Sequence, residues 1–148
     1  MMLDQERGER AAVIAEALSW ERTPYHHRGS IKGLGVDCAM FLVEVYCGTL
    51  GIARPQIEDY PPDWSLHRGE ERFLHWVLQY GVEVNDPMPA DIAMFKNGRC
   101  AGHGSIVVAW PTILHAFRDG GGVCLTHVLD YPRLRKRLQG FYRLRRWV

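Results

Sequence analysis

The first half of the chain repeats its hydrophobic residues at the spacing of amphipathic helices. This spacing predicts three helices: one over residues 8–20, one from Cys38 to about Gly48, and one over residues 69–81. A glycine closes each of the last two predicted helices, as is common at helix C-caps. Between them, residues 53–66 read ARPQIEDYPPDWSL, and this proline-rich composition predicts irregular structure.

The pattern changes at Val82, where short apolar runs separated by turn residues begin. The runs are DIAMF, GSIVVAW, TILHAF, GVCLTHVL and GFYRLRRWV, and they predict strands of an antiparallel sheet. Helices followed by strands favour an α+β fold, with N-terminal helices packed on a C-terminal antiparallel β-sheet. No internal repeat or long linker divides the 148 residues, so we expect a single domain over residues 1–148.

Composition narrows the class of protein. Hydrophobic residues make up 47% and charged residues 24%, which are ordinary globular values, and the net charge of +1 gives no general case for a nucleic-acid or membrane partner. The closing segment RLRKRLQGFYRLRRWV is locally basic. We interpret it as a solvated edge strand, with a polyanion-binding surface as the alternative. The four cysteines have no CxxC spacing, so a disulfide framework is not expected.

The N-terminal segment MMLDQERGERAAVIAEAL does not have the pattern of a signal peptide, because its apolar stretch is short and is interrupted by Glu16. No stretch of the chain approaches the length of a membrane span. We therefore expect synthesis in the cytoplasm without a signal peptide, so that any role outside the cell needs another route of delivery.

Cys38 is the strongest candidate for chemistry. The glycine-containing segment TPYHHRGSIKGLG leads to it, and it stands at the start of an apolar helix. Unpaired N–H groups and the positive dipole end favour a thiolate there, and the same N–H groups suit an oxyanion. The alternative is a buried structural cysteine. Cys47 lies nine positions further on, on the opposite side of the helix, so the two thiols cannot cooperate.

Two histidines are the candidate partners of this thiol. His103 lies at a loop-to-strand junction in AGHGSIVV, and His115 lies inside the apolar run ILHAF, with a hairpin turn expected near Trp110–Pro111. The two side chains share a face of the sheet only if the connection has an odd length or a bulge resets the parity. A shared catalytic network therefore predicts a connection of three or five residues. Cys100 and His103 form only a CxxH fragment, and we expect neither a metal nor a cofactor.

Five ordered elements resemble the NlpC/P60 superfamily of cysteine peptidases, which have permuted papain-like folds and cut bacterial cell-wall peptides. These elements are TPYHHRGS, VDCAMFLVEVY, PADIAMF, HGSIVV and ILHAF, and the resemblance runs from about Ala11 to the C-terminus. The segments YPPDWSLHRGEERFLHWV and GFYRLRRW are similar to the branch encoded with phage tail genes and to its prophage relatives.

The resemblance implies a Cys-His-His triad. Cys38 would be the nucleophile, His103 the general base and acid, and His115 the polar residue that orients His103. The implied reaction is hydrolysis of an amide through an acyl-enzyme, without a cofactor.

The resemblance also implies substrate-binding residues. Tyr25 would lie beside the nucleophile, and Asp37 would help to hold the free amine of the substrate. Ala39 belongs to the same set, but many members have Ser-Gly where this chain has Ala39 and Met40. The substitution removes a hydroxyl that can bind the substrate terminus and adds bulk beside it.

We therefore expect a cysteine endopeptidase or amidase that acts on peptidoglycan stem peptides, typically at the γ-D-glutamyl–diamino acid bond. A phage tail or tail-like particle would deliver it to the cell wall, with other tail proteins as partners. Two alternatives remain open: a catalytically silent tail-assembly component, and a thiol acyltransferase on the same fold. The acyltransferase would require a long apolar groove beside Cys38.

Overall fold

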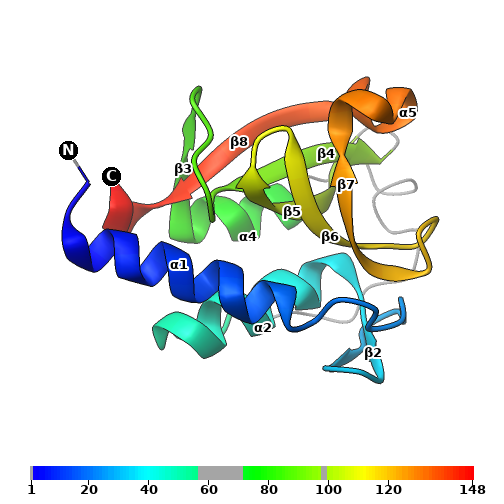
Figure 1. The fold of residues 1–148 in the computed structure, drawn as a ribbon, viewed down its shortest axis with the longest axis horizontal. Helices are drawn as coiled ribbons and strands as arrows, with labels where there is room; N and C mark the ends of the chain where they lie inside the picture. Colours follow the sequence, from blue (N-terminus) through cyan, green and yellow to red (C-terminus); the bar gives the residue numbers. More distant parts are fainter. Residues whose placement is uncertain (1, 57–71, 98–99) are drawn as a thin grey trace.

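A computed structural model describes residues 2–56, 72–97 and 100–148 of the chain. Among these residues, three helices lie against one face of a six-stranded antiparallel sheet, and short helical turns within residues 128–135 lie on the other face (Figure 1). The helices are α1 (Asp4–Leu18), α2 (Cys38–Leu50), α4 (Arg72–Tyr80) and α5 (Pro132–Arg135), with 3-10 turns η1 (Val128–Asp130) and η2 (Arg145–Trp147).

The strands form a small hairpin and a large sheet. The hairpin is β1 (Ser30–Ile31) with β2 (Gly35–Val36). The sheet has the order β3-β8-β4-β5-β6-β7 and consists of β3 (Gly81–Val84), β4 (Ile92–Asn97), β5 (Cys100–Ala109), β6 (Thr112–Phe117), β7 (Gly122–His127) and β8 (Leu138–Leu144). The predicted α+β class, with helices packed on an antiparallel sheet, is confirmed.

One of the two glycine caps was predicted at the wrong residue. Helix α2 continues through Gly48 to Leu50 and ends at Gly51, which has a φ of 68° in the left-handed region. A glycine ends a helix where the backbone turns left-handed, and that turn occurs at Gly51. Helix α4 ends at Tyr80, directly before Gly81 as predicted, and Gly81 then begins strand β3 by pairing with Leu144 of β8.

The prediction that the basic C-terminal segment forms an edge strand is also wrong. Strand β8 lies between β3 and β4, so it is an interior strand and not an edge. Tyr142 and Leu144 are buried, and Tyr142 pairs with both Glu83 and Ile92. The arginines of this segment alternate with these buried residues, which explains how a segment rich in positive charge can occupy the middle of a sheet.

Two hydrophobic clusters cover the two faces of the sheet. The larger one joins α1, α2 and α4 to the sheet through buried residues such as Val13, Phe41, Phe73 and Ile106. The smaller one lies on the opposite face and consists of Ala93, Phe95, Val107, Ile113, Val128 and Leu134. Side chains of alternating residues along β5 and β6 therefore point into different clusters, and this alternation decides where the candidate histidines lie.

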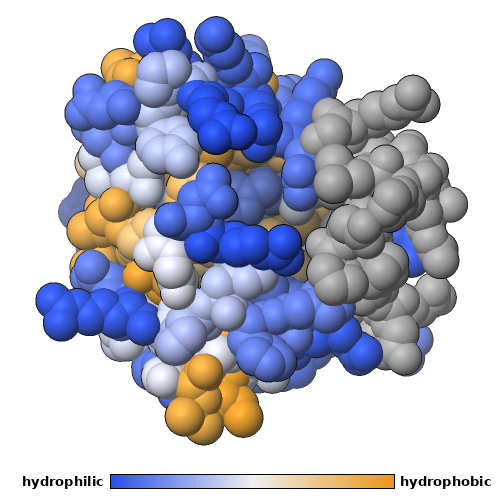
Figure 2. Space-filling view, turned by 90° about the vertical axis from the view of Figure 1, so that its right-hand side faces the viewer, coloured by the Kyte–Doolittle hydropathy of each residue, from blue (hydrophilic) through white to orange (hydrophobic). Residues whose placement is uncertain are grey.

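The hairpin β1–β2 protrudes just before α2. Ile31 and Leu34 are exposed on it, at 59% and 74% of their surface. A hydrophobic group lies at the bottom of the space-filling view, at the level of this hairpin in the ribbon (Figures 1 and 2).

Part of the prediction lies outside the described residues. This applies to most of the irregular segment at 53–66 and to most of YPPDWSLHRGEERFLHWV, since residues 57–71 are not described. Within the described ranges, no helix has the length and apolar character needed to cross a membrane.

Candidate active site

Asp37 fixes the start of α2 and thereby the position of Cys38. Its carboxylate caps the helix by accepting a hydrogen bond from the Met40 N–H at 2.9 Å, and it accepts another from the Arg28 N–H at 2.7 Å. Asp37 is buried. The residue expected to hold the amine of a substrate thus has a capping role in this structure, with its carboxylate already engaged by the backbone.

The Cys38 sulfur lies against the backbone on both sides of His103. Its Sγ is 3.8 Å from the carbonyl oxygen of Gly102, and the N–H groups of Gly104 and Ala39 are directed at it. Gly104 allows this approach, because a Cβ at Gly104 would lie 2.8 Å from side-chain atoms of both Leu42 and Phe73. The small residue in β5 therefore brings the N-terminus of α2 close to the strand that carries His103.

The resting form of Cys38 is a thiol. Burial, followed by the negative charge of Asp37, raises its pKa to about 12, although backbone N–H groups act in the opposite direction. The expectation that the helix N-terminus would yield a thiolate is therefore wrong for the unliganded site. Removal from water and a neighbouring carboxylate outweigh the helix dipole here.

His103 and His115 are joined directly. His103 Nε2 and His115 Nδ1 share a hydrogen bond of 2.8 Å. The ring of His115 stacks on Phe117 at a centroid distance of 4.5 Å, and His103 contacts the rings of Phe95 and Phe117. His115 is fully buried and His103 is half-buried. The aromatic rings hold both imidazoles in place, so the expected pairing of the two histidines is confirmed by geometry.

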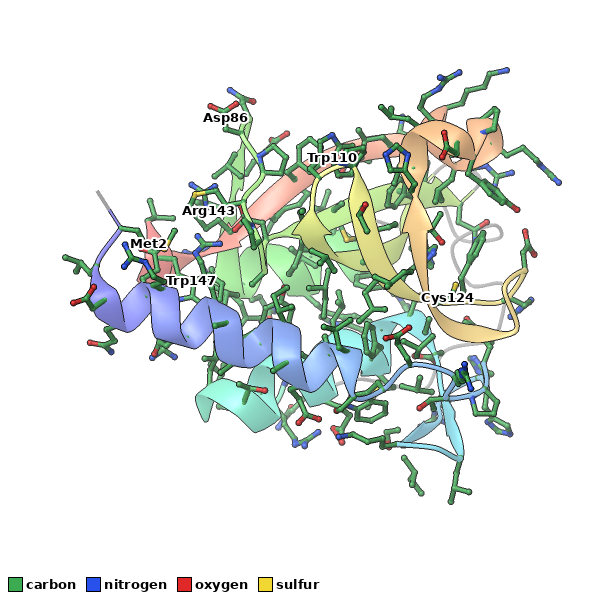
Figure 3. The ribbon with its side chains drawn as sticks, in the orientation of Figure 1. Met2, Asp86, Trp110, Cys124, Arg143 and Trp147 are labelled. Atoms are coloured by element: carbon green, nitrogen blue, oxygen red, sulfur yellow. The ribbon has the colours of Figure 1, made fainter. Side chains whose placement is uncertain are left out.

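A bulge in β5 is what places these histidines on one face. The connection from Ala109 to Thr112 has only two residues, Trp110 and Pro111, at the turn seen in Figure 3. The predicted connection of three or five residues is therefore wrong. The register shifts between Val107 and Ala109, which resets the parity by one residue, as a bulge does.

Both imidazoles are neutral at physiological pH. Burial lowers the pKa of His103 to about 4, with the positive charge of Arg137 adding to the effect. Burial also holds the pKa of His115 well below its usual value, and His103 contributes in the same direction. A neutral imidazole is able to accept a proton, and a protonated Cys38 and a neutral His103 do not form an ion pair at rest.

Sequence reasoning missed Thr126, which extends the network. Its Oγ1 lies 2.9 Å from His115 Nε2. Thr126 stands in β7 with Ile113 opposite it in β6, and it therefore faces the same side of the sheet as His115. The sequence offered only a weak indication: Thr126 lies two positions after Cys124 in the predicted strand that follows ILHAF.

The other predicted binding residues lie close by. The Tyr25 ring packs under the guanidinium of Arg118, whose Cζ is 5.0 Å from the ring centroid. Burial raises the pKa of Tyr25, and the negative charge of Cys38 once it is ionised and that of Asp37 act in the same direction. Ala39 is buried and lines an apolar cavity between α2 and α4.

This cavity has about 540 Å³ of empty space, part of it open to solvent. It begins at Ala39 and Leu42 and extends to Cys47 and Tyr80. Among the described residues that line it, neither Cys38 nor His103 is present. Within the same described ranges, no three His, Cys, Asp or Glu side chains are grouped so that they could hold a metal ion.

A cysteine at the N-terminus of a helix, packed against a sheet strand that carries a histidine, defines the permuted papain-like class of α+β folds. Comparison with solved structures identifies the fold as that of NlpC/P60 domains. The chain is 21% identical to the NlpC/P60 domain of the peptidoglycan hydrolase SagA, with a TM-score of 0.60, over 90% of this chain and 96% of that one.

Two further structures agree. An NLP/P60 family protein similar to a lipoprotein, from Staphylococcus aureus, has a TM-score of 0.69 and 19% identity, over 97% of this chain and 43% of that one. The peptidoglycan hydrolase RipB from Mycobacterium tuberculosis has a TM-score of 0.58 and 18% identity, over 92% of this chain and 64% of that one. This chain thus spans less than half of the staphylococcal protein. No family model and no curated protein sequence matches the chain.

Proposed function

We propose that this protein is a cysteine hydrolase that cuts an amide bond in peptidoglycan stem peptides. The observation that carries the proposal is the 2.8 Å hydrogen bond between His103 and His115. The backbone of β5, the strand that carries His103, also contacts the sulfur of Cys38. The fold supports the cell-wall substrate, since two of its structural neighbours are peptidoglycan hydrolases.

In this proposal Cys38 is the nucleophile and His103 is the base. The thiol is protonated at rest, so His103 Nδ1 takes its proton as Sγ attacks the carbonyl carbon and the C–N bond then breaks. His103 gives that proton to the leaving amine, and it next activates water to release the acyl group. The N–H groups of Ala39 and Gly104 point at the sulfur and suit the negative charge that develops beside it.

We further propose that the bond is of the γ-D-glutamyl–diamino acid type, and that Tyr25, Asp37 and Ala39 shape the site for the stem peptide. The proposal includes delivery by a phage tail or tail-like particle, with other tail proteins as partners. Detection of the protein in purified particles by mass spectrometry tests the delivery. Its absence from particles that package their other tail proteins would contradict it.

The hydrolase proposal is tested with purified stem peptides. Mass spectrometry of the products should show one new amine and one new carboxyl group for the native protein. Cys38→Ala should remove cleavage entirely, because it removes the nucleophile that forms the proposed acyl-enzyme. Cys47→Ala is the matched control and should cleave normally, since Cys47 lines the cavity on the far side of α2. Cleavage by Cys38→Ala would refute the assignment of the nucleophile.

A thiol acyltransferase is the second candidate: the apolar cavity lined by Ala39, the residue after Cys38, would hold its acyl chain, but Cys38 itself is not among the described lining residues. In that case a long-chain acyl thioester should acylate Cys38, with faster reaction for longer chains. Val43→Trp would fill the cavity and remove this dependence on chain length. Failure to cleave any stem peptide or to accept any acyl group would favour the silent tail component.

A further inference from the structure

The hydrogen-bond network of the site continues past the two histidines. From His103 Nε2 it passes through both ring nitrogens of His115 to Thr126 Oγ1, with distances of 2.8 and 2.9 Å. The sulfur of Cys124 lies 3.8 Å from the same hydroxyl oxygen. Three neighbouring strands, β5, β6 and β7, thus supply one chain of polar groups.

His115 has only one proton to place in this chain. It is fully buried, and a neutral imidazole has one N–H donor and one bare nitrogen acceptor. If the proton is on Nε2, His115 donates to Thr126 and accepts at Nδ1 from His103. If it is on Nδ1, His115 donates to His103 instead. The choice at His115 therefore fixes which nitrogen of His103 carries a proton.

Only the first arrangement leaves His103 ready to act as a base. With Nε2 of His103 protonated, its Nδ1 is bare and can accept the proton of a thiol. In the second arrangement Nδ1 of His103 already carries the proton and has no free lone pair with which to accept one from a thiol. Thr126, at one end of this hydrogen-bond network, thus influences which nitrogen of His103, at the other end, carries the proton.

The contacts of Thr126 favour the first arrangement. A hydroxyl group donates one hydrogen bond and accepts two. Either atom of the Cys124–Thr126 pair can be the donor, and when the Thr126 hydroxyl points its proton at the sulfur, its oxygen accepts from His115 Nε2. Thr126 is diagonal to His115 across the β6–β7 ladder, so no movement of either strand is needed for this contact.

We propose that Thr126 is a positioning residue that holds His115 in the Nε2-protonated tautomer, and through it presents an unprotonated Nδ1 on His103 to Cys38. The hydrogen-bond partners of Thr126 support the tautomer assignment, and its consequence for catalysis rests on the proposed function. Thr126 touches neither the thiol nor a reacting atom in this role.

The test compares Thr126→Val with Thr126→Ser. Valine keeps the shape of the side chain but removes the acceptor, whereas serine keeps the hydroxyl. Thr112→Val, at the start of β6, is the matched control for a threonine-to-valine change in a neighbouring strand. The first readout is the ¹⁵N shift of each ring nitrogen of His115, which distinguishes a protonated from a bare nitrogen. The second is the rate at which iodoacetamide alkylates Cys38 between pH 5 and 8, followed by peptide mass spectrometry.

In the native protein we expect a proton on Nε2 of His115 and a bare Nδ1. Thr126→Val should give a mixed or reversed protonation pattern and slow Cys38 alkylation by roughly 10- to 100-fold, the range known for losing the hydrogen-bond partner of a metal-ligating histidine. Thr126→Ser and Thr112→Val should keep the native pattern and rate. A native protein protonated on Nδ1 would overturn the proposal, as would an unchanged ¹⁵N pattern in Thr126→Val. An equal loss in Thr126→Ser would also overturn it.

These readouts separate the two proposals. If no stem peptide is cleaved but the ¹⁵N pattern responds as expected, the proposed substrate is wrong and the role of Thr126 stands. If stem peptides are cleaved at the native rate by Thr126→Val with an unchanged pattern, the role of Thr126 is wrong and the proposed function stands.

Discussion

Two polar clusters are buried in this protein, and they differ in charge. The neutral cluster consists of His103, His115 and Thr126. The charged cluster consists of Arg10, Asp91 and Arg143: the fully buried Asp91 carboxylate accepts from Arg10 at 3.0 Å and from Arg143 at 2.8 Å. Figure 3 shows Arg143 near the N-terminal half of α1 and Cys124, next to the neutral cluster, on the opposite side of the molecule.

The difference shows what each cluster is suited to do. In the charged cluster full charges are fixed by several partners, and Arg10 also lies 4.4 Å above the Trp147 ring. Moving a proton there would leave a buried charge unpaired, so this cluster is suited to holding α1, the start of β4 and β8 together. In the neutral cluster each imidazole has one protonated and one bare ring nitrogen, so it can both donate and accept a proton, as acid–base catalysis requires.

Asp91→Asn should have the largest effect on stability. It leaves the Arg10 and Arg143 guanidinium groups without their shared carboxylate, and breaking a buried pair in this way costs about 3 to 5 kcal/mol of unfolding free energy. Urea unfolding measures it. Asp86→Asn is the control, because only the backbone carbonyl of exposed Asp86 contacts Arg143. A loss under about 1 kcal/mol would show that the charged cluster is not structural.

Acid should destabilise the protein through the neutral cluster. Burial holds the pKa of His103 at about 4, below the unfolded value of 6.5. Between these values the unfolded chain binds more protons than the folded one, so stability is complete above pH 6.5 and falls as the pH falls toward 4. We expect a loss of about 1 to 3 kcal/mol for His103, with His115 adding to it.

Urea unfolding at a series of pH values measures this slope. The double variant His103→Gln with His115→Gln should have a flatter dependence between pH 6.5 and 5, whatever its absolute stability. A native protein whose stability is constant over that range would show that the imidazoles are not held neutral.

Gly104→Ala should cost about 1 to 3 kcal/mol, the usual range for overpacking. The added Cβ would meet Leu42 and Phe73 at 2.8 Å and push α2 away from β5. Gly48→Ala is the matched control, since a Cβ at Gly48 meets nothing within 4 Å and should stabilise the helix by about 0.5 to 1 kcal/mol. Thermal unfolding distinguishes the two. Equal behaviour would mean that the close approach of α2 does not depend on Gly104.

Cys124→Ala should have the smallest effect, about 0.5 kcal/mol in chemical unfolding. It removes only a 3.8 Å contact between sulfur and the Thr126 hydroxyl, on a half-buried side chain. Cys47→Ala is the comparison, as another partly exposed cysteine outside the network. A loss above about 2 kcal/mol in Cys124→Ala alone would indicate that the neutral cluster includes Cys124 as a structural member.

The sequence was sufficient to predict what depends on local patterns. Helical spacing placed Cys38 at the start of α2, and the alternating runs placed His103 and His115 in adjacent strands. The order of the elements also predicted the class of fold. These features follow from side-chain periodicity and helix capping, which act over a few residues.

What the sequence did not reveal depends on distant partners. Arg10 and Asp91 are 81 positions apart, and nothing local to either predicts a shared carboxylate. The raised pKa of Cys38 comes from burial, which is set by the packing of α2 on the sheet. The interior position of β8 depends on pairing with β3, a strand that the apolar pattern did not indicate.

The bulge at Val108 divides the β5–β6 hairpin into zones with different tolerance to changes in chain length. Deleting Val108 would join Val107 to Ala109 and keep Val107 opposite Ile113, so both histidines would stay on one face. An extra residue in the turn would leave the same partners paired. An extra residue between His103 and Val107 would instead turn His103 to the other face. Insertions and deletions at the tip of this hairpin should therefore be compatible with the site, whereas those beside His103 should not.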